Sequence, residues 1–266
     1  MIWVSYPIFS IISTIAFIVG ISLIYASISK PLLRFAGEAL LITGIISNLS
    51  FIIILWIYLN RPPLRTLGET RLWYSFFLPL IGIITYKRWN LKWFLLYSIG
   101  MSFIFLLLNL FKTETYDQTL NPALQSLWFV PHVIVYIFGY ALLAGSALMA
   151  LNGIIRFRNN SFDIQLLKRA DNLVYMGFAF ITLGLLFGAL WAKEAWGHYW
   201  TWDPKETWAF LTWLGYLIYI HIRWHLPKKI TAPLWMLALA FVILLVAWFG
   251  INYLPSAQNS VHVYSN

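Results

Sequence analysis

The chain has 266 residues, of which 61% are hydrophobic and 10% charged, with a mean hydropathy of +0.75. Soluble domains carry about a quarter charged residues, so this composition excludes a soluble domain and predicts a polytopic membrane protein. The formal net charge of +9 then bears on orientation in the bilayer and does not suggest nucleic acid as a partner, while the lack of cysteine excludes disulfides and thiolate chemistry.

Eight apolar runs are long enough to cross about 30 Å of hydrocarbon as helices. They cover residues 7–28, 36–59, 73–86, 91–111, 129–155, 171–191, 207–226 and 231–250. The third run is short and contains Pro79 and Gly82, so a re-entrant segment there would reduce the number of spans to six or seven. We expect an all-α membrane helix bundle of about eight transmembrane helices, forming a single domain over residues 1–266. The first run lacks the flanks of a cleaved signal peptide, and no convincing internal repeat is visible.

The connections between these runs alternate in charge. One set carries 12 of the 18 basic residues and is net +9, whereas the other set is net zero. The basic residues of the net +9 set are Lys30, Arg34, Lys87, Arg88, Lys92, Arg156, Arg158, Lys168, Arg169, Arg223, Lys228 and Lys229. By the positive-inside rule, the basic connections face the cytoplasm or its equivalent. Both termini and the connection between the sixth and seventh runs are therefore expected on the outer face.

That outer connection lies in a tryptophan-rich segment, residues 191–213, which holds six of the chain's fifteen tryptophans. Indole rings suit a membrane–water boundary because the ring is apolar and its N–H needs a partner. An ordinary aromatic belt needs only one or two per helix end. Six of them, interleaved with Glu194, His198, Asp203 and Glu206, indicate a surface that holds something flat, apolar and partly charged.

Within this segment Asp203, Pro204 and Glu206 have the spacing of a helix start. Asp203 is placed to cap the next helix, Pro204 suits the first helical position, and Glu206 stands at the third position for reciprocal capping. We expect this cap to fix where the neighbouring tryptophans point. Trp208 and Trp213 then either line a cavity or face lipid.

Three of the five histidines fall on the predicted outer face: His132, His198 and His262. Imidazoles among aromatic residues, without carboxylate or thiolate co-ligands at close spacing, suit haem iron better than zinc or calcium. A single histidine at a helix end is more often only an interfacial hydrogen-bonding residue. On the inner side, His221 is a candidate for a buried functional imidazole, and His225 for an interfacial residue.

Two other outer segments carry polar residues of interest. Arg61 and Arg65 are exceptions on a net-neutral face, and either Glu69, an anionic ligand such as a propionate, or lipid phosphate would pair with them. Residues 120–128 have helical apolar spacing and are expected to form a short interfacial helix that acts as a structural lid before the fifth run.

Residues 191–213, with Trp196-Gly-His-Tyr-Trp-Thr-Trp-Asp-Pro-Lys-Glu-Thr-Trp208 at their centre, resemble the "WWD" signature of haem-handling membrane proteins. That superfamily includes CcsA (ResC), CcmC and CcmF. Residues 124–150 around His132, and Phe249-Gly-Ile-Asn-Tyr-Leu254 with His262, are similar to the CcsA segments that bear the two external histidines. The match is good over residues 120–266 and weaker over Arg61–Trp89.

The resemblance implies a haem-presenting or haem-exporting subunit of a cytochrome c synthase complex, in a bacterial inner membrane or a thylakoid membrane. It implies that haem b is bound on the periplasmic or lumenal face, with His132 and His262 as axial ligands to the iron. It further implies a haem platform made by Trp191, Trp196, Trp200, Trp202, Asp203 and Trp208. His221 matches a family histidine associated with moving haem across the bilayer. The implied partners are a ResB (CcsB)-like membrane subunit and Cys-x-x-Cys-His apocytochromes c, and haem lyase activity would belong to the complex.

His198 departs from the family pattern, which usually has a small or polar residue there, so a hydrogen bond to a propionate or a neutral role is expected. Two other functions remain open. One is a CcmC-like carrier that loads a haem chaperone without catalysing attachment, although that branch usually has six helices. The other is a non-haem transporter or quinone-binding protein whose tryptophans are an interfacial belt, and it predicts no haem spectrum.

Overall fold

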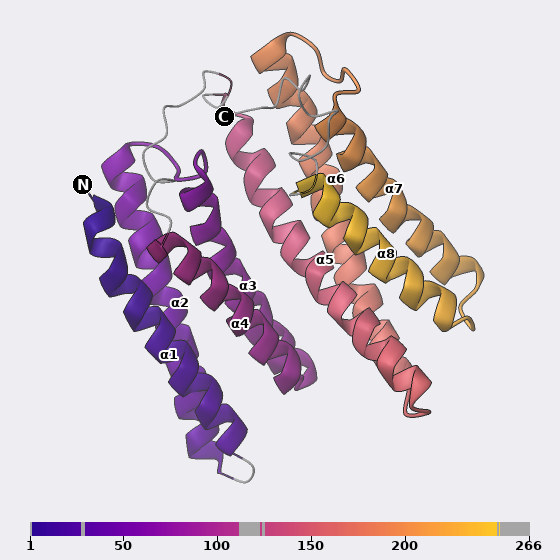
Figure 1. The fold of residues 1–266 in the computed structure, drawn as a ribbon, viewed down its shortest axis with the longest axis horizontal. Helices are drawn as coiled ribbons and strands as arrows, with labels where there is room; N and C mark the ends of the chain where they lie inside the picture. The colour runs from indigo at the N-terminus through magenta and orange to yellow at the C-terminus, as the bar shows by residue number, and fades with distance from the viewer. Residues whose placement is uncertain (1, 28–29, 112–122, 124–125, 249, 251–266) are drawn as a thin grey trace. The chain divides into compact units, whose positions relative to one another are not determined.

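The computed structural model describes residues 2–27, 30–111, 123, 126–248 and 250. Within these residues the chain is helical and contains eight α-helices (Figure 1). The helices are α1 (Tyr6–Ala26), α2 (Pro31–Leu59), α3 (Leu67–Trp89), α4 (Lys92–Phe111), α5 (Phe129–Arg158), α6 (Ile164–Trp196), α7 (Pro204–His225) and α8 (Thr231–Trp248). A short 3-10 helix, Ile2–Ser5, precedes α1. Each of the eight predicted runs overlaps one helix, which confirms the all-α prediction.

Six of these helices are long and apolar enough to cross a membrane, namely α1 (with the preceding 3-10 turn), α2, α4, α5, α6 and α8. The other two, α3 and α7, have 23 and 22 residues, which at 1.5 Å per residue is also membrane length. They fall short in hydropathy because charged residues occupy their end turns: Glu69, Lys87 and Arg88 in α3, and Glu206, Arg223 and His225 in α7. Pro79 lies inside an unbroken α3, so this helix lacks the break that a re-entrant segment would have.

The helix α6 extends beyond its apolar run at both ends. Asp163 caps its N-terminus by accepting a hydrogen bond from the backbone N–H of Gln165, and Gly197 ends it in the left-handed conformation, at φ 86°. The polar turns inside these caps, with Lys168, Arg169 and Lys193, need no burial in hydrocarbon to remain helical. The apolar run therefore marks the part of a helix that the membrane can hold, and the caps mark its true ends.

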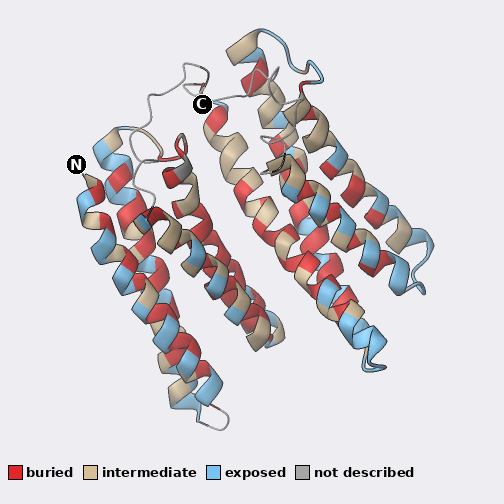
Figure 2. Ribbon diagram, viewed as in Figure 1, coloured by how far each residue is buried: buried red, intermediate tan, exposed pale blue. Residues whose placement is uncertain are grey.

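The chain divides into two compact units, residues 1–120 and 121–266, and the single haem-handling domain stays a prediction. Each unit is a four-helix bundle. In the first unit α1 packs on α2, α2 on α3 and α3 on α4, and α4 returns to α1; in the second, α5 to α8 repeat this order. Buried residues line the facing sides of the helices within each unit, and exposed residues cover the outward sides (Figure 2).

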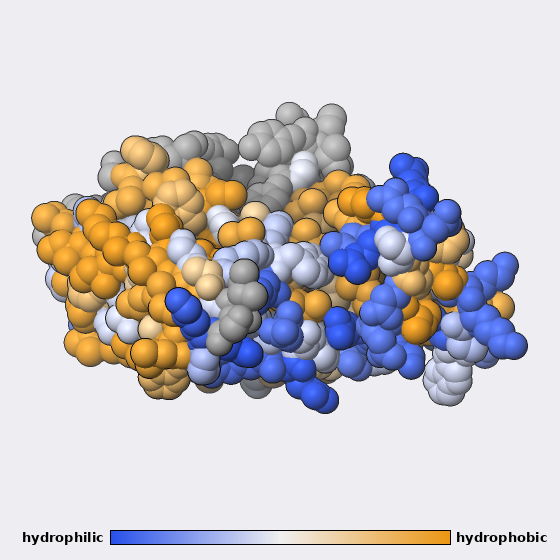
Figure 3. Space-filling model, turned by 90° about the horizontal axis from the view of Figure 1, so that it is seen from below, coloured by the Kyte–Doolittle hydropathy of each residue, from blue (hydrophilic) through white to orange (hydrophobic). Residues whose placement is uncertain are grey.

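Hydrophilic side chains gather at the turns that join α5 to α6 and α7 to α8, against hydrophobic helix flanks (Figure 3). In the second unit this end is secured by a buried ion pair: the Arg223 guanidinium donates from Nε and Nη2 to the two oxygens of Asp171, at 2.8 and 2.7 Å. The Tyr219 hydroxyl donates to the same carboxylate, at 2.7 Å. Arg223, which the charge pattern marks only as a topology anchor, therefore also ties α7 to α6.

Candidate functional site

The imidazole of His132 lies one turn inside the N-terminal end of α5, against α6. Its Nδ1 is 2.8 Å from the carbonyl oxygen of Gly184. A carbonyl only accepts hydrogen bonds, so Nδ1 carries the hydrogen and, in the neutral ring, the lone pair is on Nε2. Metal-ligating histidines are oriented in this way, by a hydrogen bond from the nitrogen that does not bind the metal. The ring has the tautomer and the fixed orientation that an axial ligand requires.

Two glycines of α6 make room for this ring. A Cβ atom at Gly188 would lie 2.8 Å from both Cε1 and Nδ1 of His132, and one at Gly184 would lie 2.8 Å from the ring of Tyr136. Histidine and tyrosine one turn apart on α5 thus pack over glycines one turn apart on α6. Any side chain at Gly188 would push the imidazole away from the Gly184 carbonyl. We did not predict these glycines from the sequence, although Gly184-x-x-x-Gly188 is the spacing typical of close helix packing in membranes.

Trp191 packs against His132, with ring centroids 5.4 Å apart. It is buried, and it also packs on Phe129 and Trp196 at 5.1 and 4.9 Å. Its indole N–H donates to the carbonyl oxygen of Ala123, at 2.7 Å. An aromatic wall therefore stands on one side of the imidazole and is fixed by a backbone contact from the segment before α5.

A second tie holds the same segment. The Ser126 hydroxyl donates to Glu194 at 2.5 Å and accepts from the backbone N–H of Trp128 at 3.1 Å. Glu194 lies on the last turns of α6, so this carboxylate and Trp191 both bind the approach to α5. From the sequence we identified Glu194 only as part of the tryptophan-rich segment. The lid helix predicted at residues 120–128 falls mostly outside the described residues.

The expected cap at the start of α7 is confirmed. Asp203 and Glu206 form a reciprocal capping box, and Pro204 occupies the first turn. Glu206 is buried, and its Oε2 accepts from the backbone N–H groups of Thr201 and Asp203, at 2.8 and 3.1 Å. These two carboxylates hold the loop Gly197–Asp203 in a defined conformation, which is a structural role.

Trp202 is the residue immediately before the N-cap residue Asp203. It has φ 59°, a left-handed conformation that is unfavourable for a bulky side chain, and its side chain is 63% exposed. Its ring meets those of Trp200 and Phe210 edge-on, at 5.7 and 5.8 Å. Strained backbone at an exposed aromatic residue is typical of functional positions. The indole N–H of Trp200 is buried and has no hydrogen-bond partner among the described residues.

The remaining tryptophans of the segment, Trp208 and Trp213, lie in α7. Trp213 donates from Nε1 to the Thr182 hydroxyl at 2.9 Å and stacks on Phe178 and Phe210. It therefore packs between α7 and α6 and faces neither an open cavity nor lipid alone. Trp208 is partly buried in the first turns of α7. His198 is exposed in the loop, where the sequence placed it.

The structure does not bring all the predicted residues together. His221 lies toward the C-terminal end of α7, with its Nδ1 on the Leu217 carbonyl oxygen of its own helix, and it is exposed in this chain. Within this chain α7 directs Tyr219 and Arg223 toward Asp171 of α6 instead, and a functional role for the His221 imidazole stays a prediction. His225 lies one turn further on, also exposed, and its ring stacks on Trp224. His262 lies outside the described residues.

Comparison with known proteins identifies the family of the chain. Residues 10–257 match the family described as cytochrome C assembly protein. The chain belongs to this family. Curated relatives of this chain are named cytochrome c biogenesis protein CcsA. The relative from Trachelium caeruleum is 33% identical over 308 aligned positions, which cover 98% of this chain and 94% of the relative. Those of Panax ginseng and Cuscuta reflexa are 32% and 35% identical, covering 95% and 80% of this chain and 93% and 79% of the relatives.

Membership gives this chain a role in cytochrome c biogenesis, with haem and apocytochromes as the molecules concerned. Its six strongly apolar helices make it an integral membrane protein. The site at His132 fits a haem substrate in its donor chemistry: one oriented imidazole, an aromatic wall, and a loop whose carboxylates are engaged in capping.

Proposed function

We propose that this chain presents haem on the outer membrane face of a cytochrome c synthase complex. In this proposal His132 and His262 are the axial ligands, and the loop Gly197–Asp203 with its tryptophans is the platform under the macrocycle. The observation that supports it most strongly is the His132 imidazole, whose Nδ1 is held by the Gly184 carbonyl while Nε2 carries the lone pair. His262 lies beyond residues 10–257, which match the family, so it is proposed only from the resemblance of its segment.

The chemistry proposed for the chain is positioning. Haem, as the substrate, would be held with its vinyl edge toward the thiols of a Cys-x-x-Cys-His segment. Holding two reactants in a near-attack arrangement lowers the barrier by about 7–11 kcal/mol relative to a bimolecular encounter. The site needs no acid–base residue of its own for this, which agrees with Asp203 and Glu206 serving as caps. A ResB-like subunit and the apocytochrome would complete the complex.

Absorption spectroscopy of the purified chain with haem tests the ligands. The wild-type chain should show a six-coordinate, bis-histidine spectrum, and His132→Ala or His262→Ala should abolish or shift it. His225→Ala is the matched control, because His225 is exposed at the other end of α7 and should leave the spectrum unchanged. If both ligand variants keep the wild-type spectrum, the ligand assignment fails.

Presentation for attachment requires a second readout, which is covalent haem on a co-expressed Cys-x-x-Cys-His peptide in the presence of the partner subunit. Trp202→Ala should lower attachment while leaving the folded chain intact, since its exposed side chain contributes little packing. Haem bound normally by the wild-type complex but never attached to the peptide would instead indicate a carrier.

A further inference from the structure

The loop Asn60–Thr66 of the first unit is built like the tryptophan-rich loop, yet it presents arginines. Each loop leaves the second helix of its unit through a left-handed C-cap, at Asn60 or Gly197, and each enters the third helix through a capping box. Both loops have the same length, so Arg65 takes the position before the N-cap that Trp202 takes in the second loop. The side chain displayed at that position is, in the first unit, a guanidinium.

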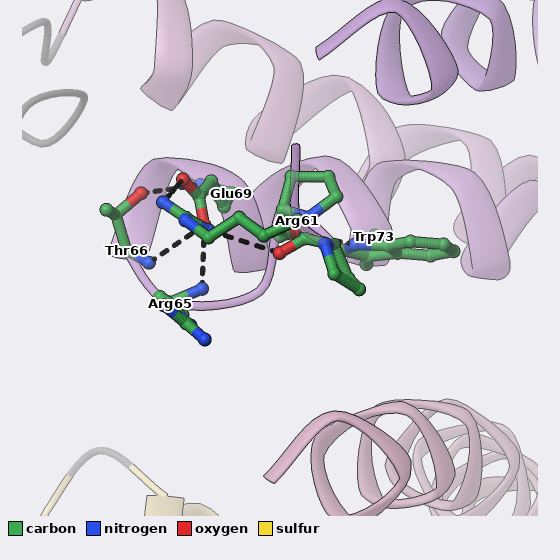
Figure 4. Close-up of polar contacts among 7 residues, drawn as sticks. Arg61, Arg65, Thr66, Glu69 and Trp73 are labelled. Atoms are coloured by element: carbon green, nitrogen blue, oxygen red, sulfur yellow. Dashed lines mark hydrogen bonds and ion pairs between the residues drawn. The ribbon is translucent and has the colours of Figure 1, made fainter. Parts of the chain in front are cut away.

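The carboxylate of this loop is fully occupied by other donors. Glu69, 1% exposed, accepts two hydrogen bonds from the Arg61 guanidinium, at 2.9 and 2.8 Å. It also accepts from the backbone N–H groups of Arg65 and Thr66, at 2.7 and 3.3 Å (Figure 4). Of the alternatives that the sequence left open for Arg61, the structure therefore selects Glu69. Arg65 contributes only its backbone N–H to this cluster.

The loop is rigid enough to aim the Arg65 side chain. Trp73 donates from Nε1 to the Pro63 carbonyl oxygen at 2.8 Å, and Arg61 donates to that of Pro62 at 3.1 Å. Figure 4 shows the Arg65 side chain on the side of the loop away from the Glu69 carboxylate. Its guanidinium makes no hydrogen bond or ion pair with the part of the chain that the structure describes.

The charge of Arg65 is poorly stabilised where it stands. The side chain is partly buried, and residues 60–71 contain three arginines and one carboxylate. Burial and the nearby Arg61 charge lower the pKa of Arg65, and Glu69 offsets only part of this. An anion with paired oxygens would remove the repulsion and take the planar fork of N–H donors that the loop leaves open.

The membrane supplies such an anion, a lipid phosphate, at the depth of the loop Asn60–Thr66. The apolar helix α2 is long enough to cross the hydrocarbon and ends at Leu59, so the short loop that follows it lies at the level of the lipid headgroups. We propose that Arg65 forms a binding site for the phosphate of an anionic phospholipid, with the loop Asn60–Thr66 as its rigid frame. The site belongs to the first unit alone and does not depend on haem binding.

Lipid retention by the full chain tests this site. The chain would be reconstituted in nanodiscs of phosphatidylcholine, alone or mixed with phosphatidylglycerol, extracted into detergent, and its bound lipids counted by native mass spectrometry. Wild type should retain phosphatidylglycerol in preference to phosphatidylcholine. Arg65→Gln should reduce that preference by about tenfold, as expected for the loss of charged hydrogen bonds. Arg65→Lys should retain part of it, because the charge remains but the fork is lost.

Arg158→Gln is the matched control, since it removes the same charge from an exposed position at the end of α5 and should leave the preference unchanged. Equal retention by wild type and Arg65→Gln would overturn the proposal. It would also be overturned if inorganic phosphate raised the thermal stability of wild type, but not of Arg65→Gln, in phosphatidylcholine alone, with no phosphatidylglycerol preference. That result would assign the arginine to a soluble anion.

Discussion

The two loops that join the second and third helices of each unit share one design and differ in what they carry. Both start from a left-handed C-cap, and both end in a capping box whose glutamate also binds backbone N–H groups of the loop. In the first loop the glutamate neutralises Arg61. In the second, its donors among the described residues are backbone and hydroxyl groups of Thr201 and Asp203. The same backbone frame thus serves an ionic surface in one unit and an aromatic surface in the other.

The comparison indicates that the carboxylates of the tryptophan-rich loop are structural. Glu69 has no tryptophan platform to serve, yet it occupies the place of Glu206 in its loop and makes the same kind of contacts. We therefore propose that function on such a frame lies in the residues before the N-cap, Arg65 and Trp202, and not in the cap itself. Four changes test this comparison.

The largest effect is expected from Glu69→Ala. This change leaves the largely buried Arg61 guanidinium without its carboxylate and frees two loop N–H groups. Breaking a buried pair in this way should lower the free energy of unfolding by about 3–5 kcal/mol, measured by SDS-induced unfolding in mixed micelles. Glu38→Ala is the control, because its partners Arg34 and Lys87 are about half exposed, and it should cost less than about 1 kcal/mol.

Glu206→Ala should cost less, because it removes hydrogen bonds from neutral donors and strands no buried cation. We expect a loss of about 1–3 kcal/mol in the same unfolding measurement. Glu206→Gln, which keeps an acceptor oxygen, should recover part of it. Equal losses for Glu69→Ala and Glu206→Ala would show that the Arg61 ion pair does not distinguish the two loops.

Gly188→Ala tests the orientation of the His132 imidazole, a feature of the second unit outside its loop. The added methyl group meets the His132 ring, and overpacking of this kind should cost about 1–3 kcal/mol and displace the ring from the Gly184 carbonyl. The bis-histidine haem spectrum should change with it. At Gly100 of α4 an added Cβ meets no atom within 4 Å, so Gly100→Ala should leave unfolding unchanged or stabilise the chain by less than about 1 kcal/mol.

The smallest expected effect is in the stability difference between glycine and alanine variants, which should have opposite signs at Trp202 and Arg65. Trp202→Gly and Trp202→Ala both remove the ring, but only glycine tolerates φ 59° without strain, so the glycine variant should be more stable by about 1 kcal/mol. Arg65 is not among the residues with positive φ, so there alanine should be the more stable by about 0.4–1 kcal/mol. The same order at both positions would show that the Trp202 conformation is not strained.

Much of the architecture was predictable because its causes are local. Hydropathy located the helices, and the spacing of Asp203, Pro204 and Glu206 predicted the start of α7. The candidate site was predictable only in part. Trp191 and His132 were both identified, but their contact, the Gly184 carbonyl and the Ser126–Glu194 hydrogen bond join segments far apart in the chain. The direction in which His221 points could not be predicted, because membrane depth alone does not say which face of a helix packs against its neighbours.

Composition, periodicity and capping act over a few residues, so they were enough to predict a membrane protein of about eight helices with an aromatic segment and candidate haem ligands. Three features required the folded structure: which nitrogen of His132 carries the lone pair, the pairing of Arg61 and not Arg65 with Glu69, and the repeat of one arrangement in the two units. The repeat is absent from the letters because the shared frame is made of backbone caps and helix order, which different side chains satisfy equally well.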